Sequence, residues 1–306
     1  MMELLFIIML AVLLDLWLGE VPASIHPVVL MGRLTDFLKP PLLRYQNKFS
    51  GIVLTFIILV IFLIPFYFIL EFLEFNLIIY ILISSFILST TFAIKALLDS
   101  TRQFMEYLDQ DLEQARHSVS QLVSRDTSNL SREELASAAL ESLTENITDS
   151  VIAPLFYTFI FGVLGGMAYR VINTLDAMVG YKDPLNKDIG WFPAKLDDVA
   201  NYLPARITGL LIVVSAVFMG LNWRASYDTI RRDARKTPSP NSGYPMAAAA
   251  GALGVQLEKK QTYILGDKIN LINREVLEQA LSLTQITVIF FLIISSIIYT
   301  CIMLLI

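Results

Sequence analysis

The run GIVLTFIILVIFLIPFYFIL at residues 51–70 holds twenty residues and no charged side chain. About 20 apolar residues in a helix span the roughly 30 Å hydrocarbon core of a bilayer. Working outward from it, residues 77–94 and residues 283–306 are also uncharged, over 18 and 24 positions. We therefore predict that these three segments are membrane helices.

Three further segments are apolar but interrupted. Segment 1–18 carries Glu3 and Asp15, and it lacks the basic start and small-residue cleavage site of a signal peptide. We interpret it as a retained span. Segments 150–169 and 203–221 contain proline and glycine, so spanning, re-entrant and buried arrangements all fit them. The predicted fold is all-α, a polytopic helical membrane protein with about 4–6 membrane-embedded helices and amphipathic helices on the cytoplasmic side.

A single integral membrane domain over residues 1–306 is the expected organisation. Residues 1–98 supply the N-terminal membrane helices and residues 283–306 the C-terminal one. Residues 99–282 form a polar catalytic region that contains the two interrupted segments.

The loop charges predict an orientation. Residues 19–50 and 95–149 are rich in Lys and Arg, whereas residues 71–76 carry only acidic charges. The positive-inside rule places the two basic regions in the cytoplasm. We expect a multi-pass protein of the cell membrane whose active site faces the cytoplasm.

Composition excludes several protein classes. Hydrophobic residues make up 55% of the 306 residues and charged residues 17%, which excludes a disordered chain and an ordinary cytosolic globule. The net charge of −5 argues against a nucleic-acid partner. A single cysteine, Cys301, leaves no disulfide, and two histidines cannot build a His-rich zinc site.

Several helices are predicted in the polar region. Residues 99–123 carry one apolar stripe with a helical period, and residues 131–148 open with a capping-box pattern. Residues 223–236 form a basic helix, and the small residues of 247–254 suit close helix packing. Asp267 is a candidate cap for the last helix.

Acidic residues recur at steps of four in two of these helices. The possible ligands are Glu141, Glu145 and Asp149 beside Asn146, and Asp197, Asp198 and Asn201. Hard oxygen ligands on facing helices suit Mg²⁺, which binds through a few carboxylates and substrate phosphate. A solvated helix face explains the spacing equally well. Interleaved cations favour an anion-and-metal site: Arg125, Arg170, Lys195, Arg206, Arg231, Arg232, Arg235 and Lys236.

Two shorter signals leave alternatives open. Arg125-Asp126-Thr127 lies between two predicted helices, where a phosphate site and a turn with an ion pair are equally good interpretations. His26 precedes Pro27, and a lone histidine is more often structural than functional.

Four ordered stretches go beyond composition. They are Asp15-Leu16-Trp17-Leu18-Gly19 with His26-Pro27; Arg125-Asp126-Thr127 with Glu141-Ser142-Leu143-Thr144-Glu145-Asn146-Ile147-Thr148-Asp149; Tyr169-Arg170 with Asn173-Thr174-Leu175-Asp176, Leu196-Asp197-Asp198, Asn201 and Arg206; and Asp233-Ala234-Arg235 with Ser239-Pro240-Asn241-Ser242-Gly243. This succession closely resembles the CobD/CbiB family of cobalamin biosynthesis proteins. The chain departs from the family pattern at Ser124, Thr237, Met246 and Glu258-Lys259-Lys260.

The resemblance implies adenosylcobinamide-phosphate synthase. Such an enzyme joins the corrinoid adenosylcobyric acid to an amino alcohol phosphate, (R)-1-amino-2-propanol O-phosphate or ethanolamine phosphate. Amide formation from a carboxylate requires activation, so ATP as co-substrate and Mg²⁺ are expected. The lipid bilayer is a further partner. Association with other membrane-bound late cobalamin-pathway enzymes and homo-oligomer formation stay open.

The clustering of charged residues fits this implied chemistry, and from it we assign hypothetical roles. Glu141, Glu145, Asp149, Asp197, Asp198 and Asn201 are the expected Mg²⁺ ligands. Lys195 is expected to stabilise the acyl phosphate, and Glu145 or Asp198 to take the proton of the amine. Phosphate and substrate contacts are expected from Arg125, Asp126, Thr127, Asn146, Arg170, Asn173, Asp176, Arg206, Arg235, Lys236, Ser239, Asn241 and His26.

Two other function classes remain as alternatives. Asn146-x-x-Asp149 and Asp197-Asp198-x-x-Asn201 loosely resemble paired Mg²⁺-diphosphate motifs, so one alternative is a membrane prenyltransferase-like enzyme. Such an enzyme would release diphosphate. A non-enzymatic membrane sensor or scaffold would tolerate loss of both acidic clusters.

Overall fold

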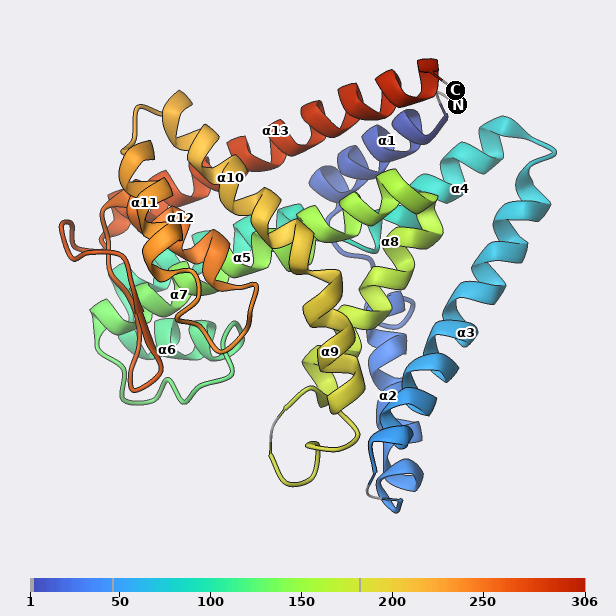
Figure 1. Ribbon diagram of the computed structural model, residues 1–306, viewed down its shortest axis with the longest axis horizontal. Helices are drawn as coiled ribbons and strands as arrows, with labels where there is room; N and C mark the ends of the chain where they lie inside the picture. The colour runs from blue at the N-terminus through green and yellow to red at the C-terminus, as the bar shows by residue number, and fades with distance from the viewer. Residues whose placement is uncertain (1–2, 46, 182, 306) are drawn as a thin grey trace. The chain divides into compact units, whose positions relative to one another are not determined.

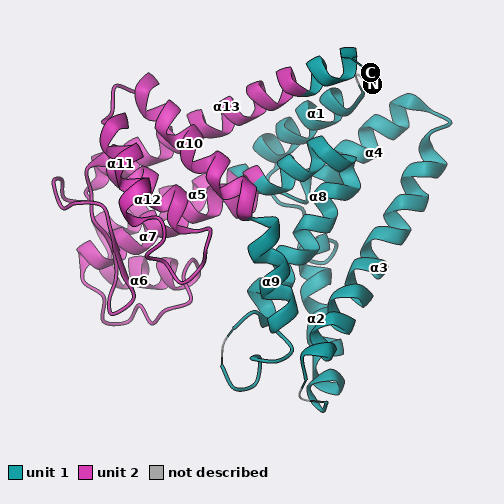
Figure 2. Cartoon of the chain, in the orientation of Figure 1, with its two compact units in different colours: residues 1–94, 153–201, 299–306 teal, residues 95–152, 202–298 magenta. Residues whose placement is uncertain are grey.

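A computed structural model of the chain describes residues 3–45, 47–181 and 183–305, and it is 75% helical (Figure 1). The prediction of an all-α fold is confirmed. By contact, the chain divides into two compact units, each assembled from separate stretches of sequence (Figure 2). Unit 1 comprises Met1–Ile94, Ala153–Asn201 and Tyr299–Ile306, and unit 2 comprises Lys95–Ile152 and Tyr202–Ile298.

Unit 1 is built around a long helix that contacts most of its neighbours. Its helices are α1 (Glu3–Leu18), α2 (Pro27–Leu43), α3 (Lys48–Leu73), α4 (Leu77–Ser89), α8 (Ala153–Val179) and α9 (Trp191–Ala200). Helix α8 contacts α2, α3, α4 and α9, and α1 packs along α4. The buried carboxylate of Asp15 accepts a 3.1 Å hydrogen bond from the backbone N–H of Ile94, so it ties α1 to the residues that follow α4.

The helices of unit 2 pack around one helix that is buried along its whole length. Its elements are α5 (Ile94–Gln110), α6 (Leu112–Ser120), α7 (Arg132–Ile147), the π-helix η1 (Thr148–Ile152), α10 (Tyr202–Phe218), α11 (Trp223–Asp233), α12 (Gly243–Leu253), the strands β1 (Leu257–Lys259) and β2 (Tyr263–Leu265), and most of α13 (Arg274–Leu305). Helix α12 is buried along its length and contacts α7, α10 and α11. A Cβ on Gly251 would lie 2.4 Å from the carbonyl oxygen of Ala225, so the small-residue run does permit close helix packing.

Helix α7 begins as the sequence predicts. The Ser131 hydroxyl accepts from the backbone N–H of Glu134, and the Glu134 carboxylate accepts from the backbone N–H of Ser131. The helix does not stop at residue 148, because η1 continues it into α8. Short π-helical turns often accompany functional sites. The next departure from helical geometry is Gly162, whose φ of 70° is strained for residues with a side chain.

Four details differ from the predictions. The helix expected over 99–123 breaks at Asp111, whose side chain caps α6. The last helix starts at Arg274 with Asn273 accepting the N–H of Val276, so Asp267 is not its cap. Helix α2 occupies the segment expected as a loop, and β1 pairs with β2 in a short antiparallel hairpin that the sequence did not reveal.

Four helical stretches among the described residues are long and apolar enough to cross a membrane. They are Lys48–Leu73, Leu77–Gln110, Arg132–Val179 and Arg274–Leu305. A fifth results if α9 and α10, bent by 43°, form one broken span. Segments 51–70, 77–94 and 150–169 and the described part of segment 283–306 fall within the four. Segment 1–18 does not: α1 has 16 residues, about 24 Å of helix, and residues 1 and 2 lie outside the described part.

Apolar surface points outward from two of these stretches. In the 18-residue apolar stretch of α3 only 17% is buried within the protein, and in that of α13 only 11%. Exposed apolar area of this extent is unfavourable in water and favourable against lipid tails. The chain is therefore a multi-pass membrane protein, as predicted.

Candidate functional site

A chain of hydrogen bonds joins α8 to α9 in unit 1. The Tyr169 hydroxyl donates to the amide oxygen of Asn201 at 2.8 Å, and the Asn201 amide nitrogen donates to Asp197 at 3.0 Å. The amide nitrogen of Asn173 lies 3.4 Å from the other Asp197 oxygen, and Arg170 donates to Asn173 over 3.4 Å. Five side chains that the sequence singled out, either as site candidates or in family motifs, thus form one network.

The fold places this network by tight packing beside α9. A Cβ on Gly190 would lie 1.8 Å from the carbonyl oxygen of Val179, so only glycine lets the chain turn from α8 into α9 here. Lys195 and Asp198 lie one turn apart on α9 and form an ion pair at 3.2 Å. Lys195 is exposed and Asp198 half-buried, so both reach the solvent side of the network. The Asp176 carboxylate packs against Gly180 at the end of α8.

An apolar cavity adjoins the same network. Its volume is about 440 Å³, and its lining is almost entirely hydrophobic: Tyr157, Phe161, Leu164, Gly165, Ala168, Tyr169, Ile172, Leu196, Val199 and Ala200. The Tyr157 and Tyr169 rings stack with centroids 5.5 Å apart. Tyr169 therefore belongs to both features, with its ring in the cavity wall and its hydroxyl in the polar network.

A second buried network lies in unit 2, centred on Glu141. One carboxylate oxygen accepts from Arg125 at 3.1 Å and from the Ser137 hydroxyl at 2.9 Å. The other accepts from the Tyr263 hydroxyl at 2.7 Å. Arg125 also donates to the carbonyl of Glu258, so the cluster fastens α7 to the hairpin. Burial, followed by the charge of Glu141, raises the pKa of Tyr263, which keeps the phenol a donor.

These contacts give Glu141 a structural role. Three protein donors contact its two oxygens, which takes up most of the roughly four acceptor sites of a carboxylate. Its predicted metal role stays a prediction. The sequence missed Ser137 and Tyr263, and no local signal marks them, because Tyr263 stands 122 residues from Glu141 in the chain.

The rest of the predicted acidic stripe lies where α7 passes into η1. Glu145, Asn146 and Asp149 are half-buried. The Asn146 amide donates to the carbonyl of Ser142 at 2.9 Å, and its oxygen lies 3.4 Å from the Ser150 hydroxyl. Asp149 lies in the π-helical turn, which has more residues per turn than an α-helix. Its side chain therefore does not point in the direction that α-helical spacing from Glu145 predicts.

Two of the predicted phosphate-binding cations, Arg235 and Lys236, lie in the loop that follows α11. Lys236 lies 2.6 Å from the buried carboxylate of Asp233, which also pairs with Arg232 at 2.9 Å and accepts the backbone N–H of Gly266 at 2.8 Å. Burial alone would raise the pKa of Asp233, but these donors outweigh it and lower the pKa to about 2. Arg235 is exposed and has no ion-pair partner among the described residues.

Arg206 of α10 meets the part of this loop that holds the candidates Ser239 and Asn241. Arg206 donates to the side-chain oxygen of Asn241 at 3.2 Å, and its guanidinium lies between the rings of Tyr202 and Tyr244, 3.5 and 4.2 Å from their centroids. The Ser239 hydroxyl accepts the backbone N–H of Asn241 at 3.2 Å. The structure thus brings Arg206 and Asn241 together and fixes the plane of the guanidinium.

Two weaker candidates have structural partners. The Asp126 carboxylate accepts the backbone N–H of Ser128 at 2.9 Å, and the Thr127 hydroxyl donates to the carbonyl of Arg116, which describes a turn. His26 is buried and its Nδ1 accepts the N–H of Val28 at 3.2 Å, so it caps α2. Burial lowers the pKa of His26, and the positive charge of Arg170 adds to this effect against the opposing charge of Glu20.

The donor set is compatible with Mg²⁺ completed by substrate phosphate. Among the described residues, no group of three or more His, Cys, Asp and Glu side chains is placed to hold a metal ion. Magnesium usually takes one or two carboxylates, with water and substrate phosphates completing the octahedron. Asp197, Asp198 and Asn201 belong to unit 1, and Glu141, Glu145 and Asp149 to unit 2. A joint ligand set stays a prediction.

Comparison with known proteins gives a consistent picture. The family described as "CobD/Cbib protein" matches residues 8–290. The "Probable cobalamin biosynthesis protein CobD" of Methanothermobacter thermautotrophicus is 50% identical and aligns over 93% of this chain and 94% of its own length. The protein of the same name from Methanocaldococcus jannaschii is 42% identical, over 96% and 97%. The "Cobalamin biosynthesis protein CobD" of Dehalococcoides mccartyi is 40% identical, over 94% and 93%. No solved structure matches the chain.

Proposed function

The chain belongs to the CobD/CbiB family and has a role in cobalamin biosynthesis, and from this we propose that it is an adenosylcobinamide-phosphate synthase. The reaction joins the propionate carboxylate of adenosylcobyric acid to the amine of an amino alcohol phosphate. ATP supplies the activation, and the product is an amide. The match over residues 8–290 favours this chemistry over a prenyltransferase-like reaction.

The observation that carries the proposal is the network of Asp197. Its carboxylate is held by the amides of Asn173 and Asn201, in a helix that forms part of a candidate span. Polar groups in membrane helices are expensive and usually serve a function. Beside it, the Lys195–Asp198 pair is open to solvent. Acidic oxygens, a cation and an apolar cavity are what binding of a charged group next to a large partly apolar substrate requires.

The chemistry assigns roles to these side chains. Transfer of a phosphoryl group from ATP to the propionate gives an acyl phosphate and ADP. The amine nitrogen then attacks the acyl carbon, the bond to the phosphate oxygen breaks, and Asp198 or Glu145 takes the amine proton. Lys195 stabilises the charge that develops on the acyl phosphate. Mg²⁺, held through Asp197, Asp198 and the phosphates, would neutralise the charge of the nucleotide.

The candidate phosphate-binding cations differ in whether a carboxylate of the protein already pairs with them. Arg235 is the leading phosphate contact, because Arg125 and Lys236 already neutralise Glu141 and Asp233. Arg206 presents a guanidinium whose plane is fixed by two rings, which suits bidentate contact with a phosphate. We place the protein in the cell membrane with its active site toward the cytoplasm, where ATP and the phosphorylated amine are available.

Turnover of ATP tests the proposal. Full-length protein in detergent should convert ATP to ADP and phosphate only when corrinoid acid and amino alcohol phosphate are both present. Mass spectrometry of the corrinoid should show the amide. Asp197→Asn and Asp198→Asn should lower the rate by about 10²-fold or more, the usual scale for general acid–base groups.

Asp228→Asn serves as the matched control, because Asp228 is an exposed acid of α11 outside the networks. Release of diphosphate instead of phosphate would favour the prenyltransferase-like alternative. Amide synthesis that survives both substitutions at Asp197 and Asp198 would refute the assigned roles, and no amide from any variant or from the wild type would refute the function itself.

A further inference from the structure

A cavity that the proposed site does not use lies in unit 1, where α2 ends and α3 begins, beside the loop that precedes α9. Its volume is about 430 Å³, within the roughly 300–1,000 Å³ of small-molecule sites. In Figure 1 the last turn of α2 and the first turn of α3 lie next to each other at the lower end of both helices. The polar side chains of its lining are Arg44, Asn47, Ser50 and Asp188.

The cavity lies at the boundary between a membrane span and water. Its lining residues Arg44, Asn47 and Ser50 directly precede the uncharged run at residues 51–70 of α3. Tyr45 and Trp191, each within two residues of a lining residue, are 70% and 40% exposed. Exposed Tyr and Trp side chains are typical of the headgroup region of a bilayer. The cavity is therefore at the depth of lipid headgroups.

The polar lining consists mainly of hydrogen-bond donors. Arg44 is exposed and has no ion-pair partner among the described residues. The side-chain oxygen of Asn47 accepts the backbone N–H of Ser50 at 3.0 Å and the Ser50 hydroxyl at 3.1 Å. This leaves the N–H₂ group of Asn47, which can only donate. Asp188 is the only acid among the described lining residues, so the lining favours an anionic acceptor.

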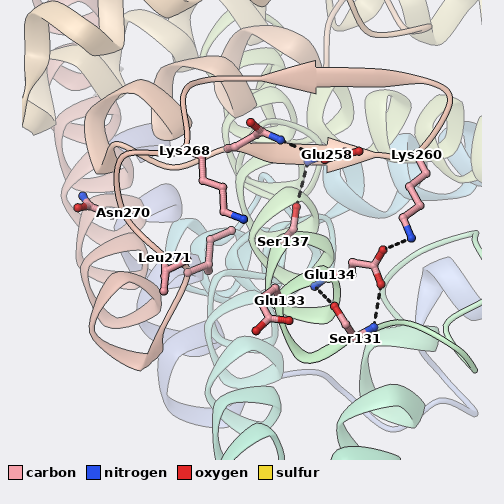
Figure 3. A pocket seen from close by; sticks show the side chains of 11 residues that line it. Ser131, Glu133, Glu134, Ser137, Glu258, Lys260, Lys268, Asn270 and Leu271 are labelled. Atoms are coloured by element: carbon pink, nitrogen blue, oxygen red, sulfur yellow. Dashed lines mark hydrogen bonds and ion pairs between the residues drawn. The ribbon is translucent and has the colours of Figure 1, made fainter.

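A cavity of similar size in unit 2 has a different charge pattern (Figure 3). Its volume is about 460 Å³, and it is lined by the carboxylates of Glu133, Glu134 and Glu258 together with two lysines. Lys260 pairs with Glu134, and Figure 3 shows Lys268 between the other two acids. An anion in that cavity would meet a carboxylate on either side of Lys268. The cavity beside α3 is the better anion site of the two.

The surroundings of the cavity in unit 1 add positive charge. Lys48 lies in the first turn of α3, with its Nζ 4.8 Å from the centroid of the Trp191 ring. Helix α3 has 26 residues, and the positive end of its dipole is at this turn. The acid Asp183 is already occupied, because its carboxylate accepts the backbone N–H groups of Leu185 and Asn186 at 2.9 and 3.1 Å.

The apolar part of the lining favours a lipid headgroup over a soluble phosphate. Leu42, Leu185 and Ile189 line the cavity beside the donors, and the apolar stretch of α3 that follows is only 17% buried. A phospholipid joins a phosphodiester to acyl chains, so its phosphate can contact Arg44 while its chains lie along α3. Basic pockets between helices at the membrane surface bind anionic headgroups in this way. A free phosphate would use only the donors.

We propose that this cavity binds the phosphodiester of an anionic phospholipid through the Arg44 guanidinium and the Asn47 amide. A guanidinium suits bidentate contact with phosphate oxygens. The bound lipid contacts α2, α3 and the loop before α9 at once, so it stabilises the packing of these three elements. The proposal does not depend on the enzymatic function proposed above.

Native mass spectrometry of the full-length protein in detergent tests the proposal, with phosphatidylglycerol as the probe. Phosphatidylcholine of the same chain length and inorganic phosphate are the comparison ligands. Phosphatidylglycerol should bind at least about tenfold more tightly than either, because only it combines a net negative charge with acyl chains. Equal affinity for phosphatidylcholine would mean ordinary lipid contact, and equal affinity for inorganic phosphate would mean a free-anion site. Either result overturns the proposal.

Two substitutions with opposite expected effects locate the site. Arg44→Gln should raise the Kd for phosphatidylglycerol by about tenfold, the scale of hydrogen bonds between charged groups. Asp188→Asn should lower the Kd by about threefold, because it removes the repulsion between the carboxylate and the phosphate.

Arg33→Gln and Asp36→Asn on α2 are the matched controls, since they make the same changes of charge outside the cavity lining. Both should leave the Kd for phosphatidylglycerol unchanged. Wild-type affinity in Arg44→Gln, weaker binding in Asp188→Asn, or an equal loss in Arg33→Gln overturns the proposal.

Discussion

The hydroxyl of Tyr169 donates a 2.8 Å hydrogen bond to the side-chain oxygen of Asn201, and both residues are almost completely buried. Through the Asn201 amide this bond fixes the direction of Asp197. An asparagine whose oxygen is held can present only its N–H₂ group to a neighbouring carboxylate. The relationship makes Tyr169, which the sequence did not select as a site residue, an orienting group for an acid that we propose to be functional.

Substitution Tyr169→Phe keeps the ring that stacks on Tyr157 and removes only the hydroxyl. We expect a loss of about 1–3 kcal/mol, because the buried oxygen of Asn201 is left without its donor. We also expect a lower kcat for amide synthesis with little change in KM, since Asp197 is held less well. Thermal unfolding in detergent and steady-state kinetics measure the two effects.

Tyr181→Phe is the control for that substitution, because Tyr181 is half exposed. An unchanged kcat in Tyr169→Phe would show that the hydroxyl serves stability alone.

Glu141 and Glu145 are one helical turn apart but should respond differently. Glu141→Gln leaves the guanidinium of Arg125 without a carboxylate in a site where Arg125 is only 17% exposed, so we expect about 2–3 kcal/mol of lost stability. Glu145→Gln should lower turnover, because we propose Glu145 for proton transfer, and it should cost less stability than Glu141→Gln because Glu145 is only half-buried. Melting curves and ATP turnover of the two variants, compared side by side, test this division. The reverse pattern would make Glu141 the functional acid.

Asp233 joins α11 to the loop that precedes Asp267. Asp233→Asn weakens the contacts to Arg232 and Lys236, and we expect a loss of about 2 kcal/mol, the scale of hydrogen bonds to a charged group. Thermal unfolding of this variant beside Asp228→Asn, on the same helix, gives the measurement. Equal melting temperatures for the two would contradict the role of the buried carboxylate.

His26 should make stability depend on pH. Because burial lowers its pKa in the folded protein below the usual 6.5, the unfolded chain binds the proton more readily. Its contribution is fully present above about pH 6.5 and is lost as the pH falls through the lower, folded pKa. His26→Asn keeps a capping oxygen without titrating. Melting temperatures between pH 8 and 5 should fall less in the variant, and parallel curves would speak against this assignment.

Gly51 lies where α3 passes the segment before α9. A Cβ there would stand 2.1 Å from the carbonyl oxygen of Ile189, so Gly51→Ala should cost about 1–3 kcal/mol or more through overpacking. At Gly32 the nearest atom is the flexible Met178 sulfur at 3.4 Å, and Gly32→Ala should be tolerated. Yields and melting temperatures in detergent compare the two, and equal stability would contradict the close approach.

Short-range patterns explain what could be read before the fold was known. A run of uncharged residues such as 51–70 predicts a membrane helix because the bilayer has a fixed thickness. The Ser131–Glu134 capping box and the small-residue run of α12 were also predictable, since capping and close packing depend on neighbours within a few residues. Family membership followed from the order of the motifs, which needs no coordinates.

Contacts between distant segments required the three-dimensional path of the chain. Tyr263 reaches Glu141 across 122 residues, and Tyr169 reaches Asn201 from another helix. Helical spacing states which residues share a face but not which partner that face meets. That partner is set by how the helices pack. Glu141 and Glu145 are therefore four residues apart on one helix but differ in role: three donors hold Glu141, and we propose Glu145 for proton transfer.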